Sequence, residues 1–401
     1  MSPAPKLAVV VSHPIQYYAP WFQHIVRSGA ADLRVFYLWN FGVTEQRDAG
    51  FGRAIKWDLP LLEGYASEFV PTSSRRPGTD RFFGLRNPTL ASRVAAWAPD
   101  AVLIFGYGHA ALLRFILTWH RHSQAPLLFR GDSHLLGRRP PRLRDRIRNL
   151  VTRHAFSRCA AFLATGKANR DFFLSHDVPA PRIFAVPHCV DNARFSHNLA
   201  ATRAQGRAWR AELGIPPSHR VILFAGKLEP KKRPDLLLSA FLASPPPETT
   251  LLLVGHGPLE SSLHVRAAGK TEVAFAPFQN QAAMPRTYAA ADVFVLPSEG
   301  HQETWGLAVN EAMAAGVPSI VSDHVGCHAD LVTEGETGWV FPAGDAAALG
   351  RKLHLALATL ADPAQAALLQ TNLALRIAQY SYDAATAGLH TALRETPASS
   401  H

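Results

Sequence analysis

Residues 291–321, ADVFVLPSEGHQETWGLAVNEAMAAGVPSIV, contain the pattern that decides the fold. The apolar run Val293–Leu296 predicts a buried strand, and a polar loop follows it. The residues from Trp305 to Ala315 predict a helix, and residues 317–321 predict the next strand. A strand, a helix and a strand in this order indicate a β-α-β unit. The unit carries two carboxylates, Glu303 in the loop and Glu311 in the helix, with seven residues between them.

The same alternation extends over the rest of the chain and predicts an α/β fold built on parallel sheets. Strands are predicted at residues 7–11, 33–38, 67–70, 101–105, 127–129, 161–164, 183–186, 221–225, 251–254, 273–275, 293–296, 319–321 and 339–341. Helices are predicted at residues 17–28, 90–97, 110–120, 142–156, 167–175, 234–242, 259–268, 282–290, 305–315, 346–378 and 382–393.

Length and rhythm indicate two domains, since 401 residues exceed one compact core. The rhythm lapses in a polar, Ala- and Arg-rich stretch, residues 191–210, which we expect to join them. The predicted domains are therefore residues 1–195 and 196–379, followed by a terminal helix and a disordered tail in 380–401. Two doubly wound domains in tandem are expected to hold a ligand in the cleft between the carboxyl ends of their sheets.

Composition limits the partners and the compartment. The formal net charge of +10 favours anionic partners such as nucleotides, acidic lipids or nucleic acid. The three cysteines are widely spaced and form no C-x-x-C pair, which argues for a reducing compartment and against a structural zinc site. No apolar run reaches the length that spans a bilayer, and the N-terminus does not read as a signal peptide. We expect a cytoplasmic protein.

Two loops in the second half have the composition of a phosphate site. After one strand come Gly226, Lys227 and Lys232, just before a helix whose N-terminal amides attract anions. A solvated basic loop explains the same residues. After the next strand, Gly255 and Gly257 form a turn that a ligand can approach closely, although glycine turns end many strands.

The two glutamates also have two readings. A carboxylate accepts two hydrogen bonds from a diol, so Glu311 is suited to a ribose and Glu303 to the hydroxyls of a sugar. The amides of residues 304–307 at the helix start suit a phosphate. Two surface glutamates are the alternative that spacing alone leaves open.

The motifs together form one ordered series that resembles the donor-binding domain of family 4 (group 1) glycosyltransferases of GT-B fold. The series consists of Lys227 and Lys232, then Gly255-x-Gly257-Pro258, then Tyr288-x-x-Ala291-Asp292, then Glu303 with Glu311, then Ala315-Gly316-x-Pro318. The stretches VPHCVDNARF (186–195), DLVTEGETGWVFPAGD (330–345) and YSYDAATAGLHTAL (380–393) extend the resemblance, the last as the helix that returns to the first domain.

The resemblance implies a role for each matching residue. Lys227 and Lys232 would hold the donor diphosphate and stabilise it as it leaves. Glu303 would bind hydroxyls of the transferred sugar, and Glu311 the ribose. Further donor contacts are implied for Gly226, Gly255, Gly257, Phe278, Thr304, Trp305, Gly306 and Leu307. The sequence departs from the family pattern at Lys227, usually Arg, and at Trp305, usually Phe.

By the same resemblance, the first domain would bind the acceptor. His13 and Gln16 follow its first strand, His109 a later one, and Arg130, Asp132 and His134 the next, so all are expected at one sheet edge. For His13 a packing role is an equal alternative. We predict no metal and no cofactor beyond the nucleotide-diphosphate sugar, and a retaining reaction. The acceptor would be a glycan or a lipid-linked glycan, with a role in cell-surface polysaccharide or glycolipid synthesis.

The Arg-rich stretch 137–158 predicts a helix with apolar residues at 143, 147, 150 and 151 and arginines at 142, 144, 146 and 148. One interpretation is a basic amphipathic helix on the anionic inner face of a membrane. The simpler expectation is a helix whose apolar side faces the core.

Two other functions remain open at this point. An epimerase acting on nucleotide sugars would keep the fold and change the chemistry. A nucleic-acid-binding protein would explain the charge, but it calls for basic residues interleaved with aromatics on one face, and the Arg-rich helix offers only part of that. We expect no nucleic acid as a partner.

Overall fold

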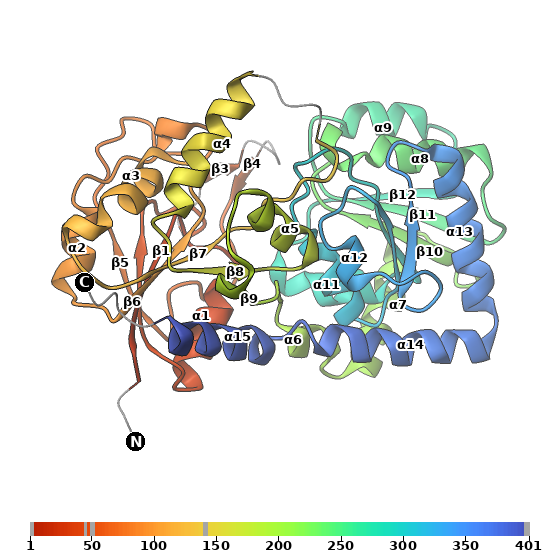
Figure 1. The fold of residues 1–401 in the computed structure, drawn as a ribbon. Coiled ribbons are helices and arrows are strands. Elements are labelled where there is room, and N and C mark those ends of the chain that lie inside the picture. Colours follow the sequence, from red (N-terminus) through yellow and green to blue (C-terminus); the bar gives the residue numbers. More distant parts are fainter. Residues whose placement is uncertain (1–3, 44–45, 49–52, 139–142, 397–401) are drawn as a thin grey trace.

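The computed structural model describes residues 4–43, 46–48, 53–138 and 143–396, and Figure 1 shows two α/β domains side by side. The fold therefore has the two-domain α/β organisation that the sequence predicts. Arg142 and the tail, residues 397–401, lie outside the described residues.

The first domain is built on a seven-stranded parallel sheet in the order β5-β2-β1-β6-β7-β8-β9. Its strands are β1 (Lys6–Val11), β2 (Asp32–Tyr37), β5 (Ala66–Phe69), β6 (Ala101–Phe105), β7 (Leu127–Arg130), β8 (Ala161–Ala164) and β9 (Ile183–Ala185). Its helices are α1 (Ala19–Arg27), α2 (Leu90–Ala96), α3 (Ala110–Thr118), α4 (Leu143–Phe156) and α5 (Lys167–Ser175). The short 3-10 turns are η1 (Phe82–Gly84), η2 (Trp119–Arg121) and η3 (Ala180–Arg182). Apolar side chains cover both faces of the sheet, as a parallel sheet requires.

One insertion adds a small element. The stretch after β2 contains an antiparallel pair, β3 (Gln46–Asp48) with β4 (Arg53–Ile55), where the sequence indicated only a loop.

The second domain has a six-stranded parallel sheet in the order β12-β11-β10-β13-β14-β15. Its strands are β10 (Arg220–Ala225), β11 (Thr249–Val254), β12 (Val273–Ala276), β13 (Val293–Leu296), β14 (Ser319–Ser322) and β15 (Gly338–Phe341). Its helices are α6 (Asn192–Ser196), α7 (Leu199–Glu212), α8 (Pro234–Ala243), α9 (Glu260–Arg266), α10 (Met284–Ala289), α11 (Leu307–Ala314), α12 (His328–Leu331), α13 (Ala346–Ala361) and α14 (Pro363–Ala378), with the turns η4 (Pro230–Lys232) and η5 (Gln281–Ala283).

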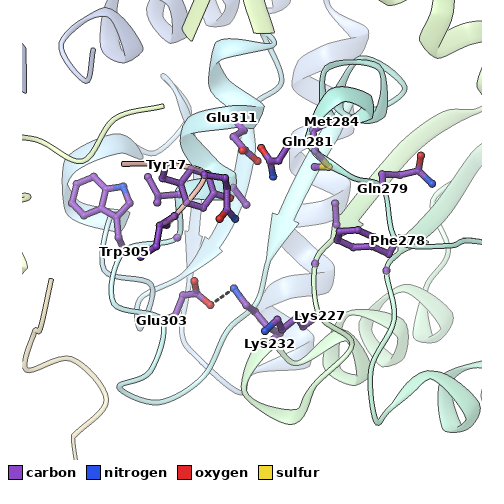
Figure 2. A pocket seen from close by; sticks show the side chains of 18 of the residues that line it. Tyr17, Lys227, Lys232, Phe278, Gln279, Gln281, Met284, Glu303, Trp305 and Glu311 are labelled. Atoms are coloured by element: carbon purple, nitrogen blue, oxygen red, sulfur yellow. Dashed lines mark ion pairs between the residues drawn. The ribbon is translucent and has the colours of Figure 1, made fainter. Parts of the chain in front are cut away.

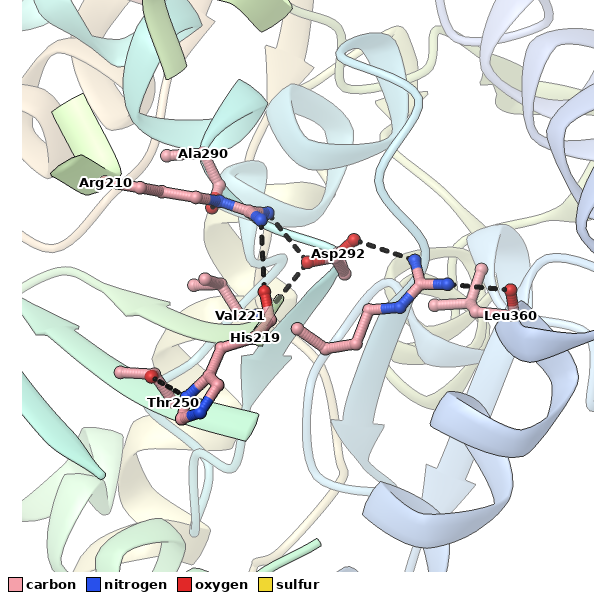
Figure 3. A network of polar contacts seen from close by, with 8 residues as sticks. Arg210, His219, Val221, Thr250, Ala290, Asp292 and Leu360 are labelled. Atoms are coloured by element: carbon pink, nitrogen blue, oxygen red, sulfur yellow. Dashed lines mark hydrogen bonds and ion pairs between the residues drawn. The ribbon is translucent and has the colours of Figure 1, made fainter. Parts of the chain in front are cut away.

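The stretch expected to link the domains, residues 191–210, folds as part of the second domain. It forms α6 and most of α7, with Phe195 and Trp209 in the second core. A polar network fixes α7 to the sheet (Figure 3). The guanidinium of Arg210 donates to Asp292 Oδ2 at 2.7 Å and to the carbonyl oxygen of Ala290 at 2.7 Å, and Asp292 also accepts from the amide of Val221 at 2.8 Å.

The chain returns to the first domain at its C-terminus. Figure 1 shows α14 and α15 (Tyr382–Glu395) in line along one side of both domains. Ala385, Leu389 and Ala392 of α15 are buried in the core of the first domain. The Trp21 indole of α1 donates to Thr386 Oγ1 at 3.1 Å.

Two helix boundaries differ from the prediction for local reasons. The helix expected from Trp305 begins at Leu307, because Gly306 adopts φ +96° and holds the preceding residue out of the helix. The region 346–378 is two helices rather than one. Asp362 caps α14 by accepting from the amides of Ala364 and Gln365, and Pro363 starts the new helix.

Candidate functional site

A cleft of about 390 Å³ lies between the carboxyl edges of the two sheets. In each parallel sheet, loops follow the carboxyl ends of the strands, and loops of both sheets line the cleft. The first domain lines the cleft with Ile15, Gln16, Tyr17, Tyr18, Trp57, Asp132 and His188. The second lines it with Gly226, Lys227, Lys232, Gly255, Phe278, Gln279, Glu303, Thr304, Trp305, Gly306, Leu307 and Glu311, among others. Figure 2 shows ten of the lining residues by name.

Lys232 and Glu303 meet inside this cleft in an ion pair, although 71 positions separate them (303 − 232). Lys232 ends the turn η4, and Arg233 separates it from the first residue of α8. Glu303 is buried, and the hydroxyl of Ser298 donates to its Oε2 at 3.0 Å. The ammonium and the carboxylate therefore both face the space that a ligand would enter.

Glycines bring the neighbouring loops together. Gly255 has φ +140°, and a Cβ there would collide with the carbonyl oxygen of Gly226. A Cβ at Gly257 would collide with the backbone of Leu228. These positions therefore exclude a side chain, and the loop after β11 packs closely against the loop that carries Lys227 and Lys232. Gly257 itself lies behind the wall and is not among the lining residues.

Helix α11 starts at the floor of the cleft. No side chain caps its first amides, so they remain available to an anion. Gly306 excludes a side chain here, because a Cβ would lie 2.9 Å from Val325 Cγ1 and 3.0 Å from Leu296 Cδ2. The Trp305 side chain is buried, and its indole donates to Asn310 Oδ1 at 2.8 Å, so this ring fixes the loop.

Glu311 lies deeper in the same wall and is 2% exposed. Its Oε2 accepts from the hydroxyl of Tyr288 at 2.8 Å, and its Oε1 lies 3.8 Å from a guanidinium nitrogen of Arg194. Within the described chain Oε1 has no hydrogen-bond partner. Burial raises the pKa of Glu311 to about 7, and the hydrogen bond from Tyr288 and the charge of Arg194 oppose this rise. A buried carboxylate oxygen that accepts no hydrogen bond, beside a cleft, is suited to accept a ligand hydroxyl.

The far wall is aromatic. Phe278 and Gln279 line it from the second domain, and the ring of Trp57 from the first domain lies 6.4 Å from that of Phe278. Arg286 donates to Gln279 Oε1 at 3.0 Å and holds that side chain in place. The rings are tilted by 56° to each other, so a planar group such as a nucleobase could stack on one of them and contact the edge of the other.

Of the residues that the sequence suggested for the acceptor, Gln16 and Asp132 line the cleft. Asp132 Oδ2 accepts from the hydroxyl of Thr304 at 2.7 Å, which joins the two domains. The same oxygen lies 3.9 Å from His188 Nε2. The structure thus brings a first-domain carboxylate beside the loop that carries Glu303.

Arg130 and His134 do not face the cleft. Arg130 is 2% exposed, and its guanidinium donates to the carbonyl oxygens of Val186 at 2.7 Å and Pro187 at 3.3 Å. An acceptor anion cannot reach it. His134 is buried with Nε2 3.1 Å from the carbonyl oxygen of Glu303, and burial lowers its pKa. Both side chains hold backbone segments together, which sequence order alone did not reveal.

His13 and His109 also lie outside the lining. The ring of His13 packs on Trp39 and Phe41 at 5.8 and 5.4 Å, in agreement with the packing alternative. His109 precedes α3, with Nδ1 3.3 Å from the carbonyl oxygen of Arg81.

Several lining residues were absent from the predicted set, among them Tyr17, Tyr18, Trp57, His188 and Tyr288. Tyr17 and Tyr18 directly follow Gln16, so their nearness to the edge was readable from the loop after the first strand. His188 lies where the chain leaves the first domain, and burial holds its pKa well below the usual range. Its position in the cleft depends on the docking of the second domain, which leaves no local signal.

Across the residues that the structure describes, no three His, Cys, Asp or Glu side chains form a group that could hold a metal ion. No described helix is long and apolar enough to cross a membrane.

Residues 206–367 match the family model of group 1 glycosyl transferases, which is less than half of the chain. A D-inositol 3-phosphate glycosyltransferase of Streptomyces bingchenggensis is 34% identical over 241 residues, 56% of this chain and 50% of that relative. A second one, from Mycolicibacterium gilvum, is 35% identical over 172 residues, 41% of this chain and 36% of the relative. The chain thus spans half or less of the length of these curated relatives.

Whole-chain similarity comes from solved structures. Anabaena HepE in complex with UDP has a TM-score of 0.72 at 17% identity, and the match covers 97% of this chain and all (100%) of that one. At this identity the likeness concerns the fold. It shows that the chain has the two-domain GT-B architecture, as the resemblance predicted.

Proposed function

We propose that this protein is a family 4 (group 1) glycosyltransferase that moves a sugar from a nucleotide-diphosphate donor to a glycan or lipid-linked acceptor. One observation carries the proposal: the Lys232–Glu303 ion pair and the buried Glu311 line one cleft between the domains, on either side of the start of α11. The match to the group 1 model covers this part of the chain. HepE was solved with UDP and with UDP-glucose, and UDP is therefore the first nucleotide to test.

The residues divide the work by their chemistry. Lys227 and Lys232, with the amides of residues 305–307, stabilise the negative charge that develops on the diphosphate as the bond to the sugar breaks. Entry of the diphosphate releases Glu303 from Lys232, and its carboxylate then accepts from sugar hydroxyls. Glu311 Oε1 accepts from the ribose. The lysines and the start of α11 neutralise the negative charge of the leaving diphosphate, so the proposed reaction needs no metal. We propose as well that the product keeps the configuration at the sugar carbon.

Donor binding is the decisive test. UDP, GDP or ADP should raise the melting temperature by several degrees at saturating concentration, because a ligand that binds only the native state stabilises it. The variants Lys232→Gln and Glu311→Ala should lose most of this shift. Lys270→Gln, at an exposed position after α9, is the matched control and should keep it. If no nucleoside diphosphate changed the melting temperature of the unaltered protein, the proposal would be wrong.

Chemistry is tested separately from binding. A screen of donor sugars with release of the nucleotide as readout identifies the substrate. An epimerase would instead return an altered nucleotide sugar. Activity that survives EDTA, and a product with the donor's anomeric configuration by NMR, would support metal-independent retaining transfer.

We also propose that the first domain touches the anionic inner face of a membrane, where a lipid-linked acceptor for surface polysaccharide or glycolipid synthesis would lie. The support comes from α4, which projects from the first domain in Figure 1. The prediction that the apolar side of this helix faces the core is wrong. Leu143 is 74% exposed and Leu150 65%, and Ile147 and Val151 are also exposed. Arginines at 144, 146 and 148 lie on the same turns. Apolar residues flanked by arginines suit an anionic lipid surface.

Vesicle binding tests this contact. Vesicles with anionic phosphatidylglycerol should retain the protein, neutral vesicles should retain less, and Leu143→Ser/Leu150→Ser should abolish the difference. Concentration-dependent self-association of the unaltered protein that this double variant removes, without vesicle binding, would assign the helix face to a second copy of the chain instead.

A further inference from the structure

A second hollow, outside the cleft, is lined by four arginines. It has a volume of about 580 Å³, and its lining includes Arg75, Arg76, Arg81 and Arg86 together with the rings of Phe82 and Phe83. No lining residue is acidic. Within the described chain, the one acidic contact of these guanidinium groups is the pair of Arg81 with Asp80 at 3.4 Å. The four positive charges therefore exceed the negative charge of their surroundings by about three.

The backbone of this hollow is held in place from below. The buried Asn87 donates through Nδ2 to the carbonyl oxygens of Val70 at 2.8 Å and Leu38 at 3.1 Å. The amide of Ser73 donates to the carbonyl oxygen of Arg86 at 2.7 Å and closes the loop. A Cβ at Gly84 would collide with the carbonyl oxygen of Gly78, so the turn η1 fits closely against the middle of the same loop. The arginines therefore project from a fixed frame.

Two aromatic rings complete the wall. Phe82 is 43% exposed and Phe83 59%, and their centroids lie 4.9 Å apart. The guanidinium of Arg86 lies 4.7 Å above the ring of Phe83, which holds this side chain in place. The hollow therefore combines guanidinium donors with exposed aromatic surface.

Position connects the hollow to the substrate side of the molecule. The loop follows β5 and returns over the end of β2, and Leu85 accepts from the amide of Ala111 at the start of α3. These are carboxyl ends of parallel strands, the edge that also forms the first-domain wall of the cleft.

We propose that this hollow binds a phosphate group, and that in the proposed transferase this group belongs to the acceptor. A phosphomonoester carries nearly two negative charges, which matches the excess of about three better than a carboxylate does. Guanidinium groups bind phosphate oxygens in pairs, and four of them provide enough donors for three oxygens. The rings of Phe82 and Phe83 bind the apolar face of the sugar or polyol that carries the phosphate. The assignment to an acceptor rests on the proposed function; the phosphate site does not.

Inorganic phosphate is the probe, titrated by calorimetry at pH 7.5 into the full chain. Because phosphate can also enter the cleft, the titration is done in the Lys232→Gln background. There we expect binding that Arg76→Gln/Arg86→Gln weakens by about tenfold or more, since charged donors make hydrogen bonds roughly twice as strong as neutral ones. Arg121→Gln, an exposed arginine beyond the far end of α3, is the matched control and should bind as its parent does. Acetate should bind more weakly than phosphate.

Three results separate the outcomes. Equal phosphate binding with and without Arg76 and Arg86, at unchanged melting temperature, would overturn the site. A loss of anionic-vesicle binding without loss of phosphate binding would assign the arginines to a membrane surface and also overturn it. The link to the acceptor would be confirmed by two results for Arg76→Gln/Arg86→Gln. A nucleoside diphosphate should still raise its melting temperature, and its KM should rise for a phosphorylated acceptor but not for the donor. Failure of the proposed function appears elsewhere, as absence of any nucleotide shift in the unaltered protein.

Discussion

The hydroxyl of Thr304 donates to Asp132 Oδ2 at 2.7 Å, and this bond joins the loop that carries Glu303 to the opposite domain. One position earlier, the carbonyl oxygen of Glu303 lies 3.1 Å from the buried His134. Two consecutive residues of the proposed donor loop are thus held by two first-domain residues that follow one strand. The position of Glu303 therefore depends on how the domains meet.

Thr304→Val should shift the protein toward an arrangement in which the domains separate. The variant keeps the side-chain shape and loses the bond to Asp132, at a cost of about 1 kcal/mol, which is roughly a fivefold change in the equilibrium. Small-angle X-ray scattering should report a larger radius of gyration. Asp132→Asn retains an acceptor oxygen and should leave the radius unchanged; an equal increase in both variants would contradict the argument.

Glu311→Gln should change stability in a pH-dependent way. The pKa of Glu311 is raised from its usual value to about 7 in the native state, so between pH 4.5 and 7 the native state binds more protons than the unfolded state. The wild type therefore loses stability as pH rises through this window, and the variant, which has no titrating group at this position, does not. The melting temperature of the variant, relative to that of the wild type, should therefore increase from pH 5 to pH 8. Glu336→Gln, at an exposed glutamate, should show no such trend.

Gly255→Ala should lower the free energy of unfolding by about 2 kcal/mol or more, because a Cβ cannot fit against Gly226 without moving backbone. Chemical denaturation measures the loss. Gly108→Ala is the control, since a Cβ there meets nothing within 4 Å. Equal stability of the two variants would contradict this argument, because it would mean that the loops of Gly226 and Gly255 can move apart without cost.

Arg130→Met distinguishes a structural arginine from an acceptor ligand. Removing the guanidinium leaves two buried carbonyl oxygens, of Val186 and Pro187, without their donor, at a cost of about 2–3 kcal/mol. Thermal denaturation should show this loss, and the folded variant should still bind nucleotide. If the variant kept full stability and had a raised KM for the acceptor, Arg130 would instead bind the acceptor, as the sequence predicted.

Local patterns predicted much of the second domain. The ordered run of Gly226, Lys227, Lys232, Gly255 and Glu303 needs only strands that end at one edge, and the structure places these residues around one cleft. The boundary at Leu307 was missed by two residues, because Gly306 adopts a positive φ that a propensity pattern does not show. The prediction that residues 191–210 link the domains was wrong, because Phe195 and Trp209 are buried by neighbours distant in sequence.

The first domain was predicted less well for the same reason. Apolar runs predict the strands of its sheet. They do not predict which of the polar loop residues face the cleft. Arg130 and His134 follow β7 as closely as Asp132 does, and only Asp132 lines the cleft. Arg130 donates to the carbonyl oxygens of Val186 and Pro187 within the first domain, and His134 contacts the carbonyl oxygen of Glu303 where the domains meet. These carbonyl oxygens need donors once they are buried, and the sequence does not show which side chain supplies them.

The sequence by itself determined the two parallel sheets and the loops at their carboxyl ends, since periodicity and turn residues act over a few positions. The candidate donor residues came from its resemblance to group 1 glycosyltransferases. The tertiary structure alone decided the pairing of Lys232 with Glu303, the burial that raises the pKa of Glu311, and the exposure of the apolar side of α4. These depend on which surfaces are left in water after the domains pack, and desolvation and packing are set by the whole chain.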